Sequence, residues 1–150
     1  MDTQPIRKLY KELLDSWNEQ DAAKYGSCFT DSGCVIGFDG SQMNNRNEIE
    51  TEIGRIFADH QTADYVSKIQ EVKCLSRDTA LLRGIAGMIP PGATDINPDA
   101  NAIQSLIASR NSDTGQWHIV LFQNTPAQFH GRPELAEALT QELQEMVSNK

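Results

Sequence analysis

The chain has 150 residues, of which 39% are hydrophobic and 23% charged, proportions typical of a soluble globular protein with one hydrophobic core. A net charge of −8 argues against nucleic acid and anionic membranes as partners, because both bind proteins through basic surfaces. The longest apolar run, at residues 119–122, is too short to cross a bilayer, and the first residues lack the apolar segment of a signal peptide.

The three cysteines, Cys28, Cys34 and Cys74, are scattered along the chain. Their number and spacing match neither a metal site nor a disulfide framework. We therefore expect reduced cysteines, no bound metal and a cytoplasmic location.

The first sixty residues have mainly helical character. Apolar residues recur at steps of three and four from Ile6 to Trp17, which predicts an amphipathic helix. A shorter helix is expected from Asp21, and residues 34–38 are expected to form a short strand. A third helix is predicted from about Asn47 to residue 59.

After His60 the apolar pattern changes to a period of two. It predicts four strands, at residues 65–75, 78–89, 101–110 and 116–125, and a last helix then begins at Pro133. This order indicates one α+β domain over residues 1–150, in which helices on the concave face of a curved antiparallel sheet enclose a pocket. Gly84 and Gly87 would allow the second long strand to bend.

Several short motifs are distinctive: WN at 17–18, D-x-x-x-Y at 21–25, NAIQSLIA at 101–108, G-x-W-x-I at 115–119 and FQNTPAQFHGRPE at 122–134. In these the chain resembles the nuclear transport factor 2-like superfamily, and within it the SnoaL-like branch of SgcJ/EcaC type. The resemblance implies a cone-shaped fold. It does not imply one activity, because members include isomerases, cyclases, dehydratases, binding proteins and a kinase association domain. The chain has no G-x-G-x-x-G dinucleotide motif, and we expect no cofactor.

The resemblance also implies which side chains line the cone. By similarity to the kinase association domain, the pocket-facing set of the last strand contains Phe122 and Asn124. The same comparison places Met88 of the second long strand, and Asn101 and Ser105 of the third, inside the cone. The apolar end would be closed by side chains from the helices and the short strand: Tyr10, Trp17, Phe38, Ile56 and His60.

The candidates for acid–base catalysis are His60, His118, His130 and Asp39. Each also has a structural interpretation: helix-end contact for His60, solvent exposure for His118, a loop position for His130 and a turn for Asp39. A pairing of His60 with His130 at the pocket rim is the alternative hypothesis. The pocket-facing sets of the last three strands carry no Asp or Glu, so an enzyme would depend on these histidines.

Three functions follow from this pattern. The first is a pocket that binds a small apolar or aromatic molecule, because apolar walls with a few amides are typical of ligand sites. The second is a proton-transfer enzyme acting on a carbonyl or polyketide-like substrate through a histidine base. The third is a non-catalytic dimerisation module. A homodimer is expected in any case through the apolar outer set of the sheet, which comprises Trp117, Ile119 and Leu121 with Leu81 and Ile85.

Overall fold

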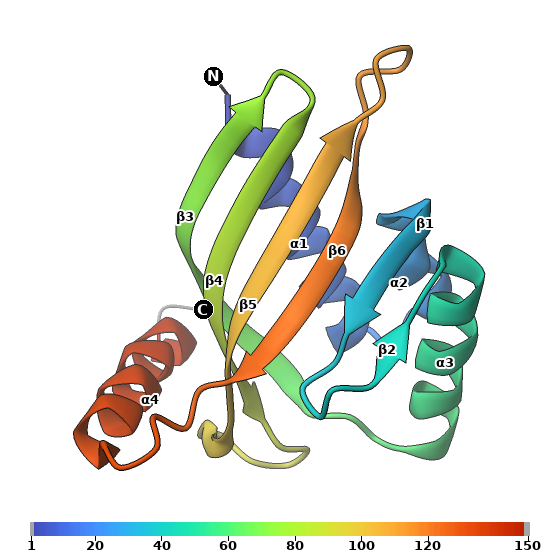
Figure 1. Cartoon of the computed structure of the whole chain (residues 1–150). Helices are drawn as coiled ribbons and strands as arrows, with labels where there is room; N and C mark the ends of the chain where they lie inside the picture. The colour runs from blue at the N-terminus through green and yellow to red at the C-terminus, as the bar shows by residue number, and fades with distance from the viewer. Residues whose placement is uncertain (1, 149–150) are drawn as a thin grey trace.

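The computed structural model describes residues 2–148, which form one six-stranded sheet and its helices (Figure 1). The elements in chain order are α1 (Gln4–Asn18), α2 (Ala22–Ser27), β1 (Phe29–Ile36), β2 (Gln42–Met43), α3 (Arg46–Asp59), β3 (Asp64–Ser76), β4 (Thr79–Ile89), β5 (Asn97–Arg110), β6 (Trp117–Pro126) and α4 (Pro133–Ser148). The predicted α+β class is confirmed.

The order of strands in the sheet is β2-β1-β6-β5-β4-β3. Strands β3 to β6 form the predicted antiparallel meander. Strand β1 lies parallel to β6, so the expectation of a wholly antiparallel sheet is wrong at this pair. A parallel pair needs a crossover connection, and here the whole segment from β2 to β5 separates the two strands.

Local capping explains where two helices begin. The Asp21 carboxylate accepts a hydrogen bond from the Lys24 amide at 3.0 Å, as expected for the N-cap of α2. Helix α3 is capped by Asn45, which accepts from the Glu48 amide at 2.8 Å. The helix begins at Arg46, one residue before the predicted start at about Asn47. Strand β1 begins at Phe29, well before the predicted start at residue 34.

The face of the sheet that α1 covers, here called the inner face, carries the main core. Register pairs Leu82 of β4 with Leu106 of β5 and Leu106 with Phe122 of β6, and all three side chains are buried against α1. Helix α1 lies behind the sheet in Figure 1 and runs obliquely across it.

Helix α4 lies on the opposite face, here called the outer face, and not on the concave side as expected for all helices (Figure 1). It buries Val66 and Ile85 with Leu139 and Leu143 in a second cluster. Ile85 is therefore 0% exposed and contributes nothing to an exposed patch.

Ile119 was also wrongly expected on the outer face. It is 0% exposed within the main core, and Trp117 packs against the same core. The reason is a β-bulge: Ile107 pairs with Leu121 but Ala108 pairs with Ile119, so Val120 is the extra residue and the alternation reverses there. Leu81 and Leu121 remain half-buried on the outer face. Among the described residues, no helix combines the length and the apolar character that crossing a membrane requires.

Candidate functional site

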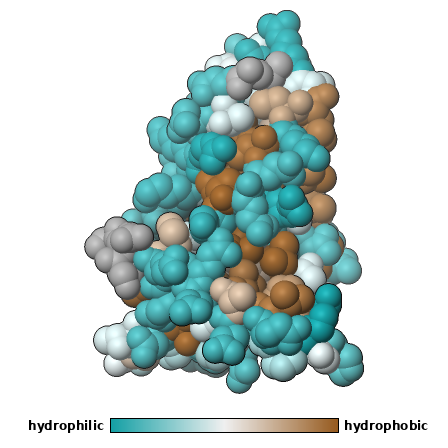
Figure 2. Space-filling model, turned by 90° about the vertical axis from the view of Figure 1, so that its left-hand side faces the viewer, coloured by the Kyte–Doolittle hydropathy of each residue, from teal (hydrophilic) through white to brown (hydrophobic). Residues whose placement is uncertain are grey.

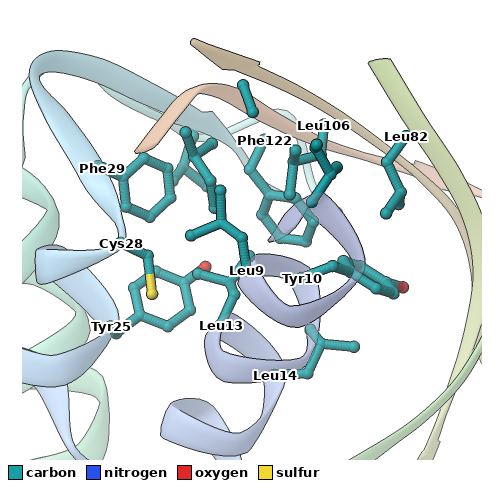
Figure 3. Close-up of a cluster of buried hydrophobic side chains, with 14 of the residues drawn as sticks. Leu9, Tyr10, Leu13, Leu14, Tyr25, Cys28, Phe29, Leu82, Leu106 and Phe122 are labelled. Carbon is teal, nitrogen blue, oxygen red and sulfur yellow. The ribbon is translucent and has the colours of Figure 1, made fainter. Parts of the chain in front are cut away.

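Helix α1 fills the central part of the inner face with side chains (Figure 3). Leu9 and Leu13 pack toward Tyr25 of α2, while Tyr10 and Leu14 project toward the side of the sheet that carries β4. The heptad-like spacing of these residues places two apolar stripes on neighbouring faces of one helix. The interior beneath the middle of α1 is thus packed core, and any ligand site must lie beside the helix.

A buried chain of hydrogen bonds crosses the inner face beneath α1. The Tyr10 hydroxyl donates to Gln104 Oε1 at 2.5 Å, and Gln104 Nε2 donates to Asn124 Oδ1 at 2.7 Å. Tyr10 is 1% exposed and Gln104 is 0% exposed. The Gln104 amide uses its oxygen toward one partner and its nitrogen toward the other, so the chain links α1 to β5 and β6 in one orientation.

Gly84 of β4 makes room for this chain. A Cβ atom at this position would lie 3.1 Å from the Tyr10 hydroxyl oxygen and 3.2 Å from the Lys68 carbonyl oxygen. Both contacts are tighter than ordinary van der Waals separation. A glycine is therefore required here for the tyrosine to reach Gln104, rather than only for the strand to bend.

Burial changes the acidity of the phenols on this face. It raises the pKa of Tyr10 well above its usual value, an effect opposed in part by hydrogen bonding with Ser67 and reinforced slightly by Tyr65. Burial also raises the pKa of Tyr65 to about 12. Both hydroxyls therefore stay protonated at neutral pH, and that of Tyr10 acts as a hydrogen-bond donor to Gln104.

A groove of about 1080 Å³ opens between α1 and β3, beside this chain. Its walls include Tyr65, Ser67 and Ile69, which are the inner-face residues of β3 because they pair with Met88, Ala86 and Gly84. Tyr10 and Leu14 contribute the α1 side of the floor, and Met146 of α4 also lines the groove. Figure 2 views this side of the molecule, where apolar patches lie among hydrophilic side chains.

Hydrogen bonds close the end of the groove near the C-terminus of α1. The Asn18 side chain donates to the Tyr65 carbonyl oxygen at 3.1 Å and accepts from the Tyr65 amide at 2.7 Å. The neighbouring Trp17 donates through Nε1 to the Ala63 carbonyl oxygen at 3.0 Å. These bonds attach the beginning of β3 to α1, so the two walls of the groove are held together at this end.

The predicted site residues of β6 lie on the inner face, whereas those of β5 do not. Phe122 and Asn124 lie on the inner face, as expected. Ser105 pairs with Arg83 and Gln123 on the outer face, so its expected place inside the cone is wrong. Asn101 is buried beneath α4, where its Nδ2 donates to Thr140 Oγ1 at 2.8 Å, and it is also outside the cone.

The residues expected to close the apolar end fall into two groups. Trp17 and Ile56 pack against the main core, and Trp17 makes an edge contact with Phe57 at a ring distance of 5.2 Å. Met88, which was expected inside the cone, pairs with the inner-face residue Tyr65 and is half-buried near the end of β4. Phe38 is 40% exposed in the segment after β1 and closes nothing.

The candidate acid–base residues are not brought together. His60 is the exposed C-cap of α3, and His130 is exposed in the loop before α4. These two segments lie on opposite sides of the molecule in Figure 1, so the alternative hypothesis of their pairing is wrong. His118 precedes the bulge, pairs with Ser109 and therefore points away from the inner face. Asp39 is an exposed turn residue that accepts from the Ser41 amide at 2.9 Å, and the hydrogen bonds from Ser41 lower the pKa of its carboxyl.

Two features of the site were missed at the level of sequence. Gln104 is the centre of the buried chain, although its neighbour Ser105 was selected instead. The β3 wall of the groove was also missed, since Tyr65, Ser67 and Ile69 alternate with Val66 and Lys68 without a clear polar face. A buried amide paired with a helical tyrosine leaves no local signal in sequence, because the two residues are 94 positions apart. Within residues 2–148, no three His, Cys, Asp or Glu side chains gather as they would around a metal ion.

Comparison with known structures shows the same fold in several bacterial proteins. A domain of unknown function with a cystatin-like fold from Nostoc punctiforme is 20% identical, with a TM-score of 0.79 over 99% of this chain and 93% of that one. An NTF-2 like protein of unknown function from Shewanella oneidensis is also 20% identical, with a TM-score of 0.68 over 83% and 99% of the two chains. A ketosteroid isomerase-like protein from Erwinia carotovora is 18% identical, with a TM-score of 0.65 over 82% and 94%.

A comparison with curated protein sequences finds no match. The family model of the SnoaL-like domain, in contrast, matches residues 6–120, which include α1, the inner-face residues of β3 to β5 and the start of β6. The sequence match and the shared cystatin-like architecture agree with each other. The chain belongs to the SnoaL-like domain family.

Proposed function

We propose that the protein binds a small apolar or aromatic molecule in the groove between α1 and β3. The observation that carries this proposal is the groove itself, whose volume of about 1080 Å³ is at the upper end of the range usual for small-molecule sites. The expectation from sequence was a ligand inside the cone. The packed core beneath α1 moves the proposed site to the β3 side of the same concave face.

The composition of the groove supports this function. Its floor combines the aliphatic side chains of Leu14 and Ile69 with the rings of Tyr10 and Tyr65. Ser67 adds a hydroxyl beside the Tyr10 phenol. Apolar walls with a few convergent polar groups are the usual arrangement of a ligand site, because the apolar area supplies affinity and the polar groups supply orientation.

A fluorescence titration with N-phenyl-1-naphthylamine tests the proposal, because this neutral aromatic probe becomes bright in apolar sites. We expect saturable binding to the wild-type protein and loss of binding in Ile69→Trp, whose larger side chain fills the groove. The matched control is Leu75→Trp, on the same strand at a side chain that is 58% exposed and outside the groove. Equal binding by both variants would place the probe elsewhere and refute the proposed site.

Native mass spectrometry of protein purified from its own host gives an independent measurement. A discrete additional mass of a few hundred daltons that is lost in Ile69→Trp would identify the class of ligand. An additional mass that persists in Ile69→Trp would contradict binding in the groove.

We also propose a homodimer formed through the outer face. Leu81, Ile107 and Leu121 are half-buried there, and Val120 at the bulge is 38% exposed. These side chains lie on the neighbouring strands β4, β5 and β6 and are not part of the cluster that α4 buries. An apolar sheet face of this kind usually marks association. Sedimentation velocity gives the assembly mass that tests this proposal.

We also propose a family branch and a cellular location for the protein. The motifs quoted above support membership of the SgcJ/EcaC-type branch. The cysteines Cys28, Cys34 and Cys74 are all free, which supports the proposed cytoplasmic location, where thiols are kept reduced.

A further inference from the structure

The cationic side chains that line the groove differ in whether they have a carboxylate partner. Lys8, Lys11 and Lys68 line it, and each has a carboxylate partner: Glu12 at 3.9 Å, Asp15 at 2.6 Å and Glu142 at 3.0 Å. Arg7 lines the same groove and has no ion-pair partner anywhere in residues 2–148. An arginine without a carboxylate partner at the edge of a ligand-sized groove is available to pair with an anionic ligand.

The orientation of Arg7 leaves its binding edge free. Its Nε donates to Thr3 Oγ1 at 3.1 Å, which holds the half-buried side chain against the first turn of α1. Nη1 and Nη2 have no partner among the residues that the structure describes. A guanidinium held in this way presents a planar pair of donors, which matches the two oxygens of a carboxylate.

Arg7 and Leu14 line the groove at different points along α1. Arg7 lies near the N-terminal end, and Leu14 follows seven residues later, about 10 Å along the helix axis at ~1.5 Å per residue. Beyond Leu14, the Asn18 side-chain amide is held in place by the bonds that it donates to and accepts from the Tyr65 backbone.

The groove is also lined by the carboxylates of Asp2, which accepts from the Gln4 amide at 2.9 Å, and Asp15, which pairs with Lys11 at 2.6 Å. Arg7 therefore offers an unpaired guanidinium near one end, and Leu14 offers apolar surface further along the helix.

We propose that the ligand of this groove is an amphipathic monoanion, whose carboxylate pairs with Arg7 and whose apolar body extends over Tyr10, Leu14 and Ile69. The inference rests on the proposed function and adds the chemical class of the ligand. Its apolar body spans about 10 Å, the separation of Arg7 and Leu14 along the helix, which corresponds to a medium-length alkyl chain or a small ring system.

Competition between two matched probes tests the inference. Sodium decanoate and 1-decanol share an alkyl chain and differ in charge, and both are measured by displacement of N-phenyl-1-naphthylamine. We expect decanoate to displace the dye from the wild-type protein at a concentration at least tenfold below that of decanol, because a charge-assisted hydrogen bond contributes about that factor. In Arg7→Gln this preference should disappear, while the affinities for the dye and for decanol stay within about twofold.

The control for removing a charge is Arg55→Gln, on the exposed surface of α3 and outside the groove, where Arg55 pairs with Glu52. It should keep the full preference for decanoate. If decanoate and decanol displace the dye equally well from the wild-type protein, the carboxylate inference is overturned while the binding function stands. If the preference persists in Arg7→Gln, the assignment of the anchor is overturned, and failure of the dye to bind at all would overturn the proposed function as well.

Discussion

Replacement of Tyr10 by phenylalanine tests the buried hydrogen-bond chain on which the inner face depends. The change removes one oxygen atom and leaves the ring in place, so packing is nearly unaltered. It leaves Gln104 Oε1 without its donor at a position that is 0% exposed. An unsatisfied buried acceptor costs about 1–3 kcal/mol, so we expect Tyr10→Phe to lower the free energy of unfolding by about that amount.

The interaction itself is isolated by a double-mutant cycle with Gln104→Leu. That second change removes the acceptor and leaves the Tyr10 hydroxyl without its main partner, at a similar expected cost. The double variant has no orphaned group at this pair, and Asn124 is half-buried, so water can replace its lost contact. The two single costs should therefore exceed that of the double variant, with a coupling energy of about 1–2 kcal/mol.

Urea unfolding followed by circular dichroism measures all four proteins, and equal m-values would show that the same surface is exposed on unfolding. The matched control is Tyr25→Phe, since the Tyr25 hydroxyl is in the core but makes no hydrogen bond within residues 2–148. We expect the control to change stability by less than about 0.5 kcal/mol. Additive single effects, or a Tyr10→Phe variant as stable as the control, would refute the assigned chain.

Three further outcomes are expected. Gly84→Ala should lower the free energy of unfolding by about 1–3 kcal/mol, because the added Cβ meets the Tyr10 hydroxyl and a backbone carbonyl. The control Gly37→Ala, whose nearest contacts are at 3.5 Å, should be tolerated. Comparable urea midpoints for the two variants would contradict this reasoning. Leu121→Arg should convert a dimer to a monomer in sedimentation velocity, and an unchanged mass would remove the outer face as the interface. Burial raises the pKa of the Cys28 thiol to about 11, above its unfolded value, so its contribution to stability is complete below about pH 9 and is lost as the pH rises toward 11. Between pH 8 and pH 10 the wild type should therefore lose about 1 kcal/mol more than Cys28→Ala, and parallel pH profiles would exclude this linkage.

The fold was predictable because its determinants are local. The period of the apolar residues distinguished helices from strands, and Asp21 and Pro133 marked helix starts where the structure has them. The two-residue strand β2 was not predictable, since it lies in a turn-rich segment and pairs only through Val35 and Ile36. The parallel pairing of β1 depends on tertiary packing and has no local signal.

The candidate site was predicted less well because both faces of the sheet carry apolar residues. Although part of the outer face is left uncovered by α4, both faces of β5 carry apolar residues: Ile103 and Ile107 lie on the outer face and Ala102 and Leu106 on the inner face. Polarity therefore does not distinguish the two sets. The polar residues Gln104 and Ser105 are adjacent, and only the pairing of Gln104 with Tyr10 shows which one is inside. On β6, the bulge at Val120 reversed the alternation. That reversal left Phe122 and Asn124 correctly placed and moved His118 away from the inner face.

The parallel pairing of β1 with β6 also has a kinetic consequence. Strands β3 to β6 join through successive hairpins, so their contacts close short loops, whereas Phe29 and Ile119 are about 90 residues apart and close a very long one. We therefore expect the meander to assemble first and the N-terminal segment to dock late. Until β1 arrives, the backbone of β6 is an unpaired edge available to other chains, and a nascent or partly unfolded molecule is most prone to aggregate at that strand.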